Sequence, residues 1–415
     1  MQNTTRLYQR LYCCCYLVVL IAYVFIVYVP LLQYGFIKGS DDDWQLLNNP
    51  DVTGRFPESV YHTFSHTYQG QYSPVNTLVY IFVNWISGLD SFSFHLLSVL
   101  IHLLNAFLVF RNVYNLISLC CNNISMQWVS LQYALFITVI FVIHPIQIES
   151  VFWVSASKVL LVWFFSLWSM NRYILYLKYQ KKRYYFYSVF FFGVACFTKE
   201  QAVILPLLLL LIDYIVMRRI TKRQLIEKIP FLLIAFLIGL FTLQIKPDTV
   251  GVYTKETVDY FTSDRILQAV YCSQQYLYRV LFPIINSPYK AYTLLSSKVF
   301  YGVAWMEVFS FIVLLSLAVF KKNKIFIFCC LFYIFSIILT LPIVPISRRF
   351  LMADRYMYVS LITCYVGIFA LMGNIPLQEL RKPFSRGLLC AYILYLFASS
   401  VVLANNWRTL YLQMS

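Results

Sequence analysis

Long apolar runs separated by short polar stretches dominate the chain. About 20 consecutive apolar residues cross the hydrocarbon core of a bilayer as a helix. The pattern therefore predicts an all-α polytopic membrane protein with about 11 transmembrane helices. The predicted spans lie near residues 11–32, 94–111, 129–144, 159–177, 184–198, 201–217, 229–245, 300–320, 325–341, 356–373 and 387–404.

A further apolar run, at residues 75–88, is too short to span a bilayer. We expect it to form an interfacial helix in the first outer loop. Arg6 and Arg10 precede the first span, and no small-residue cleavage site follows it. These features predict a retained signal anchor rather than a cleaved signal peptide.

Basic and acidic residues gather at opposite span ends. With a cytoplasmic N-terminus and 11 spans, nearly every cluster of Lys and Arg lies inside, as the positive-inside rule requires. Most carboxylates then lie outside, together with two sizeable loops at about 33–93 and 246–299. The C-terminus is also predicted outside. We expect residues 1–415 to form one transmembrane domain without the internal repeats of transporters.

Composition agrees with this interpretation. Hydrophobic residues make up 60% of the 415, and the mean hydropathy is +0.69, which a soluble domain could not bury. The net charge of +16 is explained by cytoplasmic loops and does not indicate nucleic acid. The 11 cysteines lie mostly in apolar segments without a CxxC motif, so neither a cysteine-bound zinc site nor a redox site is indicated.

Three adjacent carboxylates, Asp41, Asp42 and Asp43, open the first outer loop. Adjacent carboxylates repel one another, so at least one should have a raised pKa or a cation nearby. That chemistry suits a general base or a metal ligand. The alternative is a helix cap or a solvated turn, because the turn-forming residues Asn48, Asn49 and Pro50 follow.

Polar residues at the outer end of the third predicted span are further candidates. His144 ends this span, and Glu149 and Lys158 follow it. In a helix, Glu149 and Trp153 would share one face. The alternative is that Trp153 and Lys158 only anchor the chain at the membrane interface.

Cations on the predicted outer side form a third group. Lys199 and Glu200 join two short spans, where snorkelling to the interface is the simpler explanation. Arg348, Arg349 and Arg355 lie outside against the positive-inside trend. Guanidinium groups bind phosphate through paired hydrogen bonds, so a lipid phosphate would fit them.

Metal binding stays open at this stage. His95 and His102 share a helix face, and we expect them to bond to neighbouring helices rather than to a metal. No cofactor is indicated with certainty, although the outer carboxylates could hold a divalent ion.

Carboxylates and cations on the outer face of a helix bundle suit sugar transfer from a polyprenyl-phosphate donor. A carboxylate takes the proton of an acceptor hydroxyl, which attacks the anomeric carbon while lipid phosphate leaves. Cations stabilise the leaving phosphate. A single displacement of this kind inverts the anomeric configuration.

The order of the motifs resembles that of the GT-C glycosyltransferases. It is most similar to the membrane domain of the transmembrane-and-tetratricopeptide-repeat O-mannosyltransferases and their bacterial relatives. The resemblance extends across nearly the whole chain and implies a GT-C-like bundle. The matching stretches are DDDWQLLNNPDV, QYSPVNTL, FHLLSVLIHLLN, HPIQIESVFWVSASK, FTKEQAVILPLLLLLIDY, ADRYMYV and NNWRTLYL.

The resemblance implies roles for individual residues. Asp41 and Asp42 match the acidic pair of the first outer loop, and Asp43 matches the more variable next position. His144 and Glu149 would contact acceptor or donor. On charge alone, lipid phosphate would be bound by Lys199 and Arg355. The full set of other matching polar positions is His144, Glu149, Lys158, Lys199, Glu200, Arg355 and Tyr356.

The implied partners are a polyprenyl-phosphate hexose such as mannose, a protein or glycan acceptor and the lipid bilayer. The expected location is the bacterial cytoplasmic membrane, or the endoplasmic reticulum in a eukaryote. Two departures stand out. The chain ends at Ser415, where the repeats of longer relatives would begin, and Ser73 replaces the arginine of many relatives. We therefore expect any selection of acceptors by repeats to be missing or to be supplied by another protein.

Three other functions remain alternatives. A polysaccharide polymerase or ligase of the outer leaflet would share the spans and outer arginines, but would not need the acidic cluster. A lipid or glycan transporter or flippase would favour charges at mid-span and internal pseudo-symmetry. An inactive glycolipid-binding scaffold is the third, because of Ser73.

Overall fold

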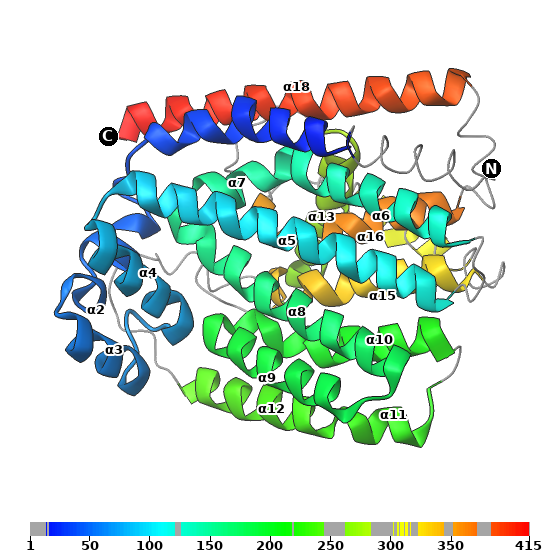
Figure 1. The fold of residues 1–415 in the computed structure, drawn as a ribbon, viewed down its shortest axis with the longest axis horizontal. Coiled ribbons are helices and arrows are strands. Elements are labelled where there is room, and N and C mark those ends of the chain that lie inside the picture. Colours follow the sequence, from blue (N-terminus) through cyan, green and yellow to red (C-terminus); the bar gives the residue numbers. More distant parts are fainter. Residues whose placement is uncertain are drawn as a thin grey trace. The chain divides into compact units, whose positions relative to one another are not determined.

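The computed structural model describes residues 14, 16–120, 126–217, 220–244, 262–283, parts of 302–316, 323–343, 352–371 and 383–414. Every element named in these residues is a helix (Figure 1). One isolated bridge pairs Tyr68 with Gln71. The all-α class predicted from the sequence is therefore confirmed.

The number of spans is lower than predicted. Within the described residues, five helices are long and apolar enough to cross a membrane, and a bent pair of helices makes a sixth. The prediction of about 11 spans is therefore corrected to five or six. Several long apolar helices still indicate a multi-pass membrane protein. The helices are Tyr16–Gln33, Ser91–Cys120, Val154–Tyr179, Glu200–Met217 and Gly387–Thr409, and the pair, bent by 56°, is Trp128–Ile143 with Pro145–Phe152.

The other predicted spans fall short for a simple physical reason. α9 (Lys182–Thr198) has 17 residues and α12 (Ile229–Gln244) has 16 described residues, fewer than the roughly 20 that cross the hydrocarbon core. The apolar helix Lys324–Thr340 is also too short. α16 (Ser360–Leu371) has 12 described residues, and much of the run 300–320 lies outside the described part.

The chain divides into two compact units, one of residues 1–246 with 393–415 and one of residues 247–392. In the first unit, α5 (Ser91–Cys120) packs against α6 (Met126–Ile143) and α8 (Ser157–Tyr179), as Figure 1 shows. The single domain predicted for residues 1–415 stays a prediction.

Buried polar side chains join the long helices of the first unit. The amide of Asn105 donates to the carbonyl of Leu160, and the amide of Asn112 donates to that of Leu167, both at 2.9 Å. The two asparagines are seven residues apart, so both face α8. Hydrogen bonds of this kind stabilise helix pairs in membranes.

His95 and His102 are buried, as their positions on an apolar helix predict. His102 Nε2 lies 3.4 Å from the Tyr28 hydroxyl, and His95 Nε2 lies 3.5 Å from the Gly35 carbonyl. His102 thus contacts a neighbouring helix, η1 (Val24–Tyr28), as predicted, whereas His95 contacts a carbonyl of the non-helical segment 34–37.

The loop of residues 33–93, which the sequence predicts to lie outside, contains four short helices. They are η3 (Asp43–Leu47), α2 (Pro50–Thr53), α3 (Phe56–Ser65) and α4 (Pro74–Ser87). α4 coincides with the helix predicted at 75–88, and it exposes Trp85. Its place at the membrane interface stays a prediction.

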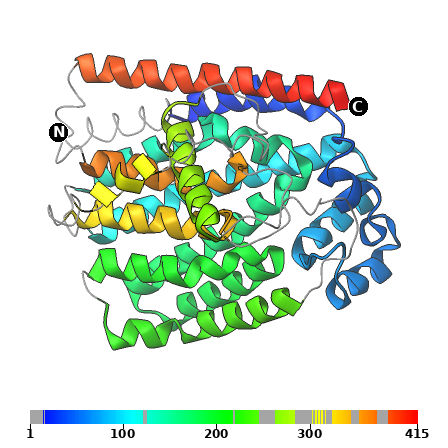
Figure 2. The same cartoon turned by 180° about the vertical axis from the view of Figure 1, so that it is seen from behind.

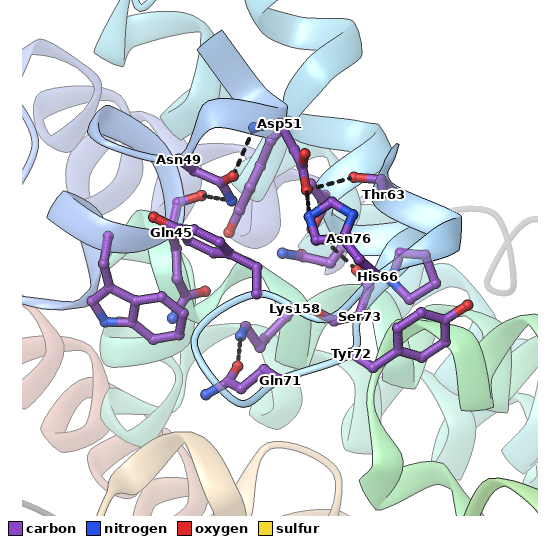
Figure 3. Close-up of a pocket in the computed structure, with 15 residues that line it drawn as sticks. Gln45, Asn49, Asp51, Thr63, His66, Gln71, Tyr72, Ser73, Asn76 and Lys158 are labelled. Atoms are coloured by element: carbon purple, nitrogen blue, oxygen red, sulfur yellow. Dashed lines mark hydrogen bonds and ion pairs between the residues drawn. The ribbon is translucent and has the colours of Figure 1, made fainter. Parts of the chain in front are cut away.

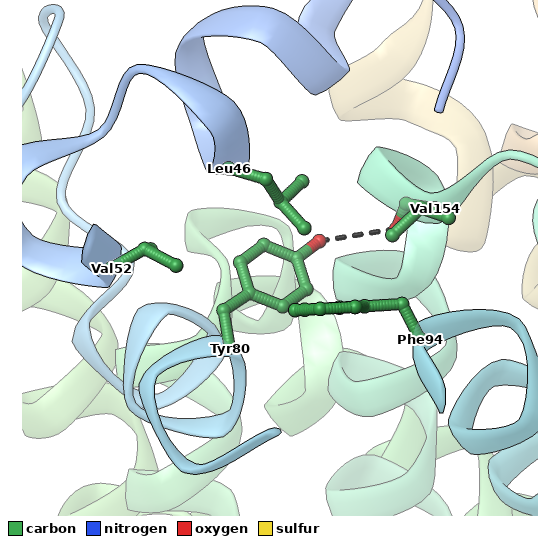
Figure 4. Close-up of a cluster of buried hydrophobic side chains, with 5 residues drawn as sticks. All are labelled: Leu46, Val52, Tyr80, Phe94 and Val154. Carbon is green, nitrogen blue, oxygen red and sulfur yellow. Dashed lines mark hydrogen bonds between the residues drawn. The ribbon is translucent and has the colours of Figure 1, made fainter. Parts of the chain in front are cut away.

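A small apolar core fastens these loop helices to the bundle. Leu46, Val52 and Tyr80 from the loop pack with Phe94 of α5 and with Val154 (Figure 4). The Tyr80 hydroxyl donates to the Val154 carbonyl at 3.1 Å. The loop is therefore held next to the start of α8.

The second unit contains α13 (Thr262–Leu281), α15 (Lys324–Ile337), η10 (Asp354–Met357) and α16. α15 packs against α16, and α13 crosses α16 (Figure 2). The Tyr276 hydroxyl of α13 donates to the Ala353 carbonyl at 3.2 Å and accepts from its amide at 3.0 Å. Arg279 pairs with Asp354. These contacts fix the segment that carries Arg355 and Tyr356.

Candidate functional site

Asp42 is the central residue of the acidic triplet, and it is completely buried, with 0% of its surface exposed. Its Oδ2 accepts from the amide of Ile37 at 2.9 Å, and its Oδ1 accepts from the amide of Ser155 at 2.9 Å. The Ser155 hydroxyl also donates to Oδ1. Burial raises the pKa of Asp42 to about 6, against these hydrogen bonds, which lower it.

Asp41 and Asp43 are half-buried and face different partners. Asp41 Oδ1 accepts from the Trp44 indole N–H at 3.2 Å. Asp43 accepts from the amide of Gly39, a glycine with a left-handed φ of 70°. Asp42 and Asp43 thus satisfy backbone amides, as the turn interpretation predicts. Asp41 is the carboxylate of the triplet that bonds to a side chain of the neighbouring pocket.

A polar pocket, about 390 Å³ including space open to solvent, is lined by Trp44 and Gln45, which directly follow the triplet (Figure 3). Asp41, Asp42 and Asp43 do not line it. It is formed by η3, the segment 66–73, the start of α4 and Lys158 of α8. Lys158 Nζ donates to Gln71 Oε1 at 2.8 Å and lies 5.7 Å from the centre of the Trp44 ring. The lining residues are Trp44, Gln45, Asn49, Asp51, Thr63, His66, Tyr68, Gln71, Tyr72, Ser73, Pro74, Asn76, Thr77, Tyr80 and Lys158.

Two amide oxygens in this pocket are buried without a hydrogen-bond donor among the described residues. They are Gln45 Oε1 and Asn76 Oδ1, in side chains that are 6% and 2% exposed. A buried acceptor without a donor costs roughly 1–3 kcal/mol. Both oxygens are themselves shielded from solvent, so a donor in the pocket would reach them only after these side chains turn.

Asp51, His62 and His66 form a second polar cluster at the edge of the pocket. Their ligand-type atoms all lie within 4.8 Å of one another. Asp51 Oδ2 is 3.3 Å from His66 Nε2, and Asp51 Oδ1 is 4.0 Å from His62 Nδ1. Among the described residues, this is the group with the composition and spacing of a metal site.

His144 and Glu149 lie deep in the first unit. His144 is fully buried, and its Nδ1 accepts from the amide of Ile146 at 3.1 Å, so it caps the turn Pro145–Gln147. Glu149 is buried in the short helix α7 (Ile148–Phe152). Neither residue lines the pocket.

The remaining sequence candidates are spread over both units. Lys199 is half-buried at the end of α9, and Glu200 is exposed. Arg355 and Tyr356 belong to the second unit, where the guanidinium carbon lies 5.2 Å from the Tyr356 ring centre. Arg348 and Arg349 fall outside the described residues.

The structure thus brings together part of the candidate set. Asp41 and Lys158, 117 positions apart, both contact Trp44. Sequence reasoning missed the pairing of Asp51 with His62 and His66. The four-residue spacing of the two histidines is a signal that could have indicated a shared helix face.

Comparison with known proteins gives no match. No family model, curated protein or solved structure matches this chain. The resemblance to GT-C enzymes therefore stays a hypothesis drawn from the motifs.

Proposed function

We propose that this protein is a membrane glycosyltransferase of GT-C type. It would transfer a sugar, such as mannose, from a polyprenyl-phosphate donor to a hydroxyl of a protein or glycan acceptor. The reaction would take place on the non-cytoplasmic face, with the N-terminus in the cytoplasm and the C-terminus outside. A bacterial cytoplasmic membrane or the endoplasmic reticulum would house it.

The pocket beside the acidic triplet carries this proposal. Its lining includes Gln45 and Asn76, whose buried amide oxygens have no donor among the described residues, and sugar hydroxyls would be donors to them once these side chains turn into the pocket. Trp44, Tyr68 and Tyr72 add aromatic surface to the lining. Binding pockets commonly combine such surfaces with a few placed polar groups.

Asp41 is the better candidate for the general base, because it is more exposed to solvent than Asp42. A base must come within about 2.6–3.2 Å of the proton that it removes. Asp42 is fully buried under backbone and serine donors, whereas Asp41 is half-exposed next to Trp44. Asp42 would act as a positioning residue, because it joins the start of η3 to Ser155, three residues before Lys158.

The proposed step needs no reactant other than the sugar donor and the acceptor. Asp41 takes the proton of the acceptor hydroxyl, and the acceptor oxygen bonds to the anomeric carbon. The bond from that carbon to the phosphate oxygen breaks, and the lipid phosphate leaves with the electron pair. The Lys158 ammonium in the pocket would stabilise its charge. Roles of Lys199 and Arg355 toward the lipid phosphate stay predictions.

The test uses purified protein in lipid nanodiscs with radiolabelled polyprenyl-phosphate hexose and an acceptor mixture. Asp41→Asn should lower release of polyprenyl phosphate by about 10²–10⁴-fold, the usual contribution of a general base. Lys158→Met should weaken donor binding. Asp90→Asn removes an exposed carboxylate at the start of α5, and it should leave the rate unchanged.

Release that persists in Asp41→Asn would remove the base assignment. Absence of release with every donor tested would favour the transporter or scaffold. Release of polyprenyl phosphate without an added acceptor sugar or protein, together with growth of a polysaccharide chain, would favour a polysaccharide polymerase.

A further inference from the structure

The cluster of Asp51, His62 and His66 combines a buried carboxylate with two accessible imidazoles. The Asp51 side chain is 7% exposed, whereas those of His62 and His66 are 64% and 37% exposed. A buried carboxylate needs a hydrogen-bond donor or a cation. The cluster thus has one fixed ligand and two ligands that solvent and ions can reach.

Local structure explains how the three side chains meet. His62 lies in α3, and the amide of His66, at its end, donates to the His62 carbonyl at 3.2 Å. The rings therefore lie one turn apart, with centres 5.0 Å from each other. Asn49 caps α2 by accepting from the Asp51 amide at 3.0 Å, and Asp51 Oδ2 lies 3.5 Å from the hydroxyl of Thr63 in α3.

The distances suit a metal ion after a small adjustment. Two ligands of a tetrahedral ion with bonds of about 2.0–2.2 Å are separated by about 3.4 Å. The separation of Asp51 Oδ2 from His66 Nε2 is 3.3 Å, and that of Asp51 Oδ1 from His62 Nδ1 is 4.0 Å. Rotation of the exposed His62 ring would close the wider gap without moving the buried residue.

We infer that Asp51, His62 and His66 form a binding site for a divalent transition metal of the zinc class. Two imidazole nitrogens with one carboxylate favour such ions over Mg²⁺ and Ca²⁺, which prefer oxygen ligands alone. The Thr63 hydroxyl, 3.5 Å from Asp51 Oδ2, lies where a group that orients this ligand would be.

The position of the site gives it a role beyond holding α2 against α3. Asp51 and His66 also line the polar pocket, so a bound ion would form part of its wall (Figure 3). Three protein ligands leave a coordination position open. An ion there can polarise an oxygen of a bound molecule. The assignment comes from the ligand set and holds whether or not the protein is a glycosyltransferase.

The experiment measures metal binding alone, without a sugar donor. Full-length protein without a polyhistidine tag, in nanodiscs, is dialysed against radioactive Zn²⁺, and Co²⁺ is titrated with detection by its visible spectrum. We expect one ion per chain. His62→Gln and His66→Gln should each weaken binding by at least about tenfold, since loss of even a second-shell partner has that effect.

His62 provides the cleanest variant, because its side chain is 64% exposed and its replacement disturbs little packing. Glu58→Gln is the matched control, since it removes an exposed carboxylate from α3 outside the cluster. Stoichiometric binding that both histidine variants lose and Glu58→Gln retains would support the site. Absence of binding in the wild type, or equal binding in all four proteins, would overturn it, leaving the cluster as a contact of the Asp51 carboxylate with two imidazole rings.

Discussion

At the scale of single residues, burial separates three carboxylates that look equivalent in the sequence. Asp42 is enclosed by the amides of Ile37 and Ser155, and Asp41 stays half-exposed beside Trp44. Charged groups lose hydration when they are buried, so the enclosed carboxylate has the raised pKa. That shift makes the folding stability depend on pH.

Asp42 should destabilise the fold as the pH rises through its folded-state pKa. Burial raises this pKa from 3.8 to about 6, so the folded state holds the proton more tightly than the unfolded state. The stabilising contribution is complete below about pH 3.8 and is lost as the pH rises through 6, a change of about 3 kcal/mol.

The measurement is thermal or denaturant unfolding of purified protein between pH 4 and pH 7. Asp42→Asn cannot titrate, so its stability should fall less over this range than that of the wild type. Asp90→Asn, at an exposed position, should keep the wild-type pH dependence. Parallel curves for the wild type and Asp42→Asn would contradict the prediction.

At the scale of elements, a buried ion pair joins three helices of the first unit. Lys228 precedes α12 and donates to Asp213 of α10 (Leu205–Met217) and to the Tyr173 hydroxyl of α8. Tyr173 also donates to Asp213 at 2.9 Å. Lys228 and Asp213 are fully buried. A charge of this kind is tolerated only with its partner present.

Lys228→Met should therefore lower the free energy of unfolding by about 3–5 kcal/mol, because Asp213 would remain as a buried charge without its cation. The double variant Asp213→Leu with Lys228→Met should recover most of the loss. Lys222→Met serves as the control, since Lys222 is exposed. The comparison uses thermal unfolding in detergent, and equal stability of the single and double variants would contradict this account.

At the scale of the whole molecule, the longest helices determine the topology. α5 has 30 residues, so its length is about 45 Å, more than the roughly 30 Å of hydrocarbon core. We therefore predict that its two ends lie on opposite sides of the membrane, so that the loop of residues 33–93 and Cys120 face different compartments.

Labelling of cysteines tests this topology. In intact cells, a membrane-impermeant thiol reagent should label Ser65→Cys, an exposed position of α3 in the first outer loop. Cys120 is exposed at the far end of α5 and should react only after permeabilisation. Peptide mapping by mass spectrometry distinguishes the two sites. Labelling of Cys120 in intact cells without reaction at residue 65 would reverse the predicted orientation.

The sequence by itself determined where helices form, because the length of each apolar run and the spacing of its apolar residues indicate a helix without knowledge of distant contacts. The helix at 75–88 and the buried positions of His95 and His102 follow from such local patterns. The sequence did not determine how many helices are long enough to span a bilayer, since helix ends depend on caps and turns. α9, for example, ends at Thr198 after 17 residues.

Only the tertiary structure decided which polar residues meet. Lys158 bonds to Gln71 across 87 positions, and Asp42 bonds to Ser155 across 113. No local pattern encodes contacts at such separations, because they depend on the packing of α4 and α5 against α8. The same packing buried Asp42, left Asp41 half-exposed and placed Lys158 in the pocket. Those differences in burial set the chemistry that each residue can perform.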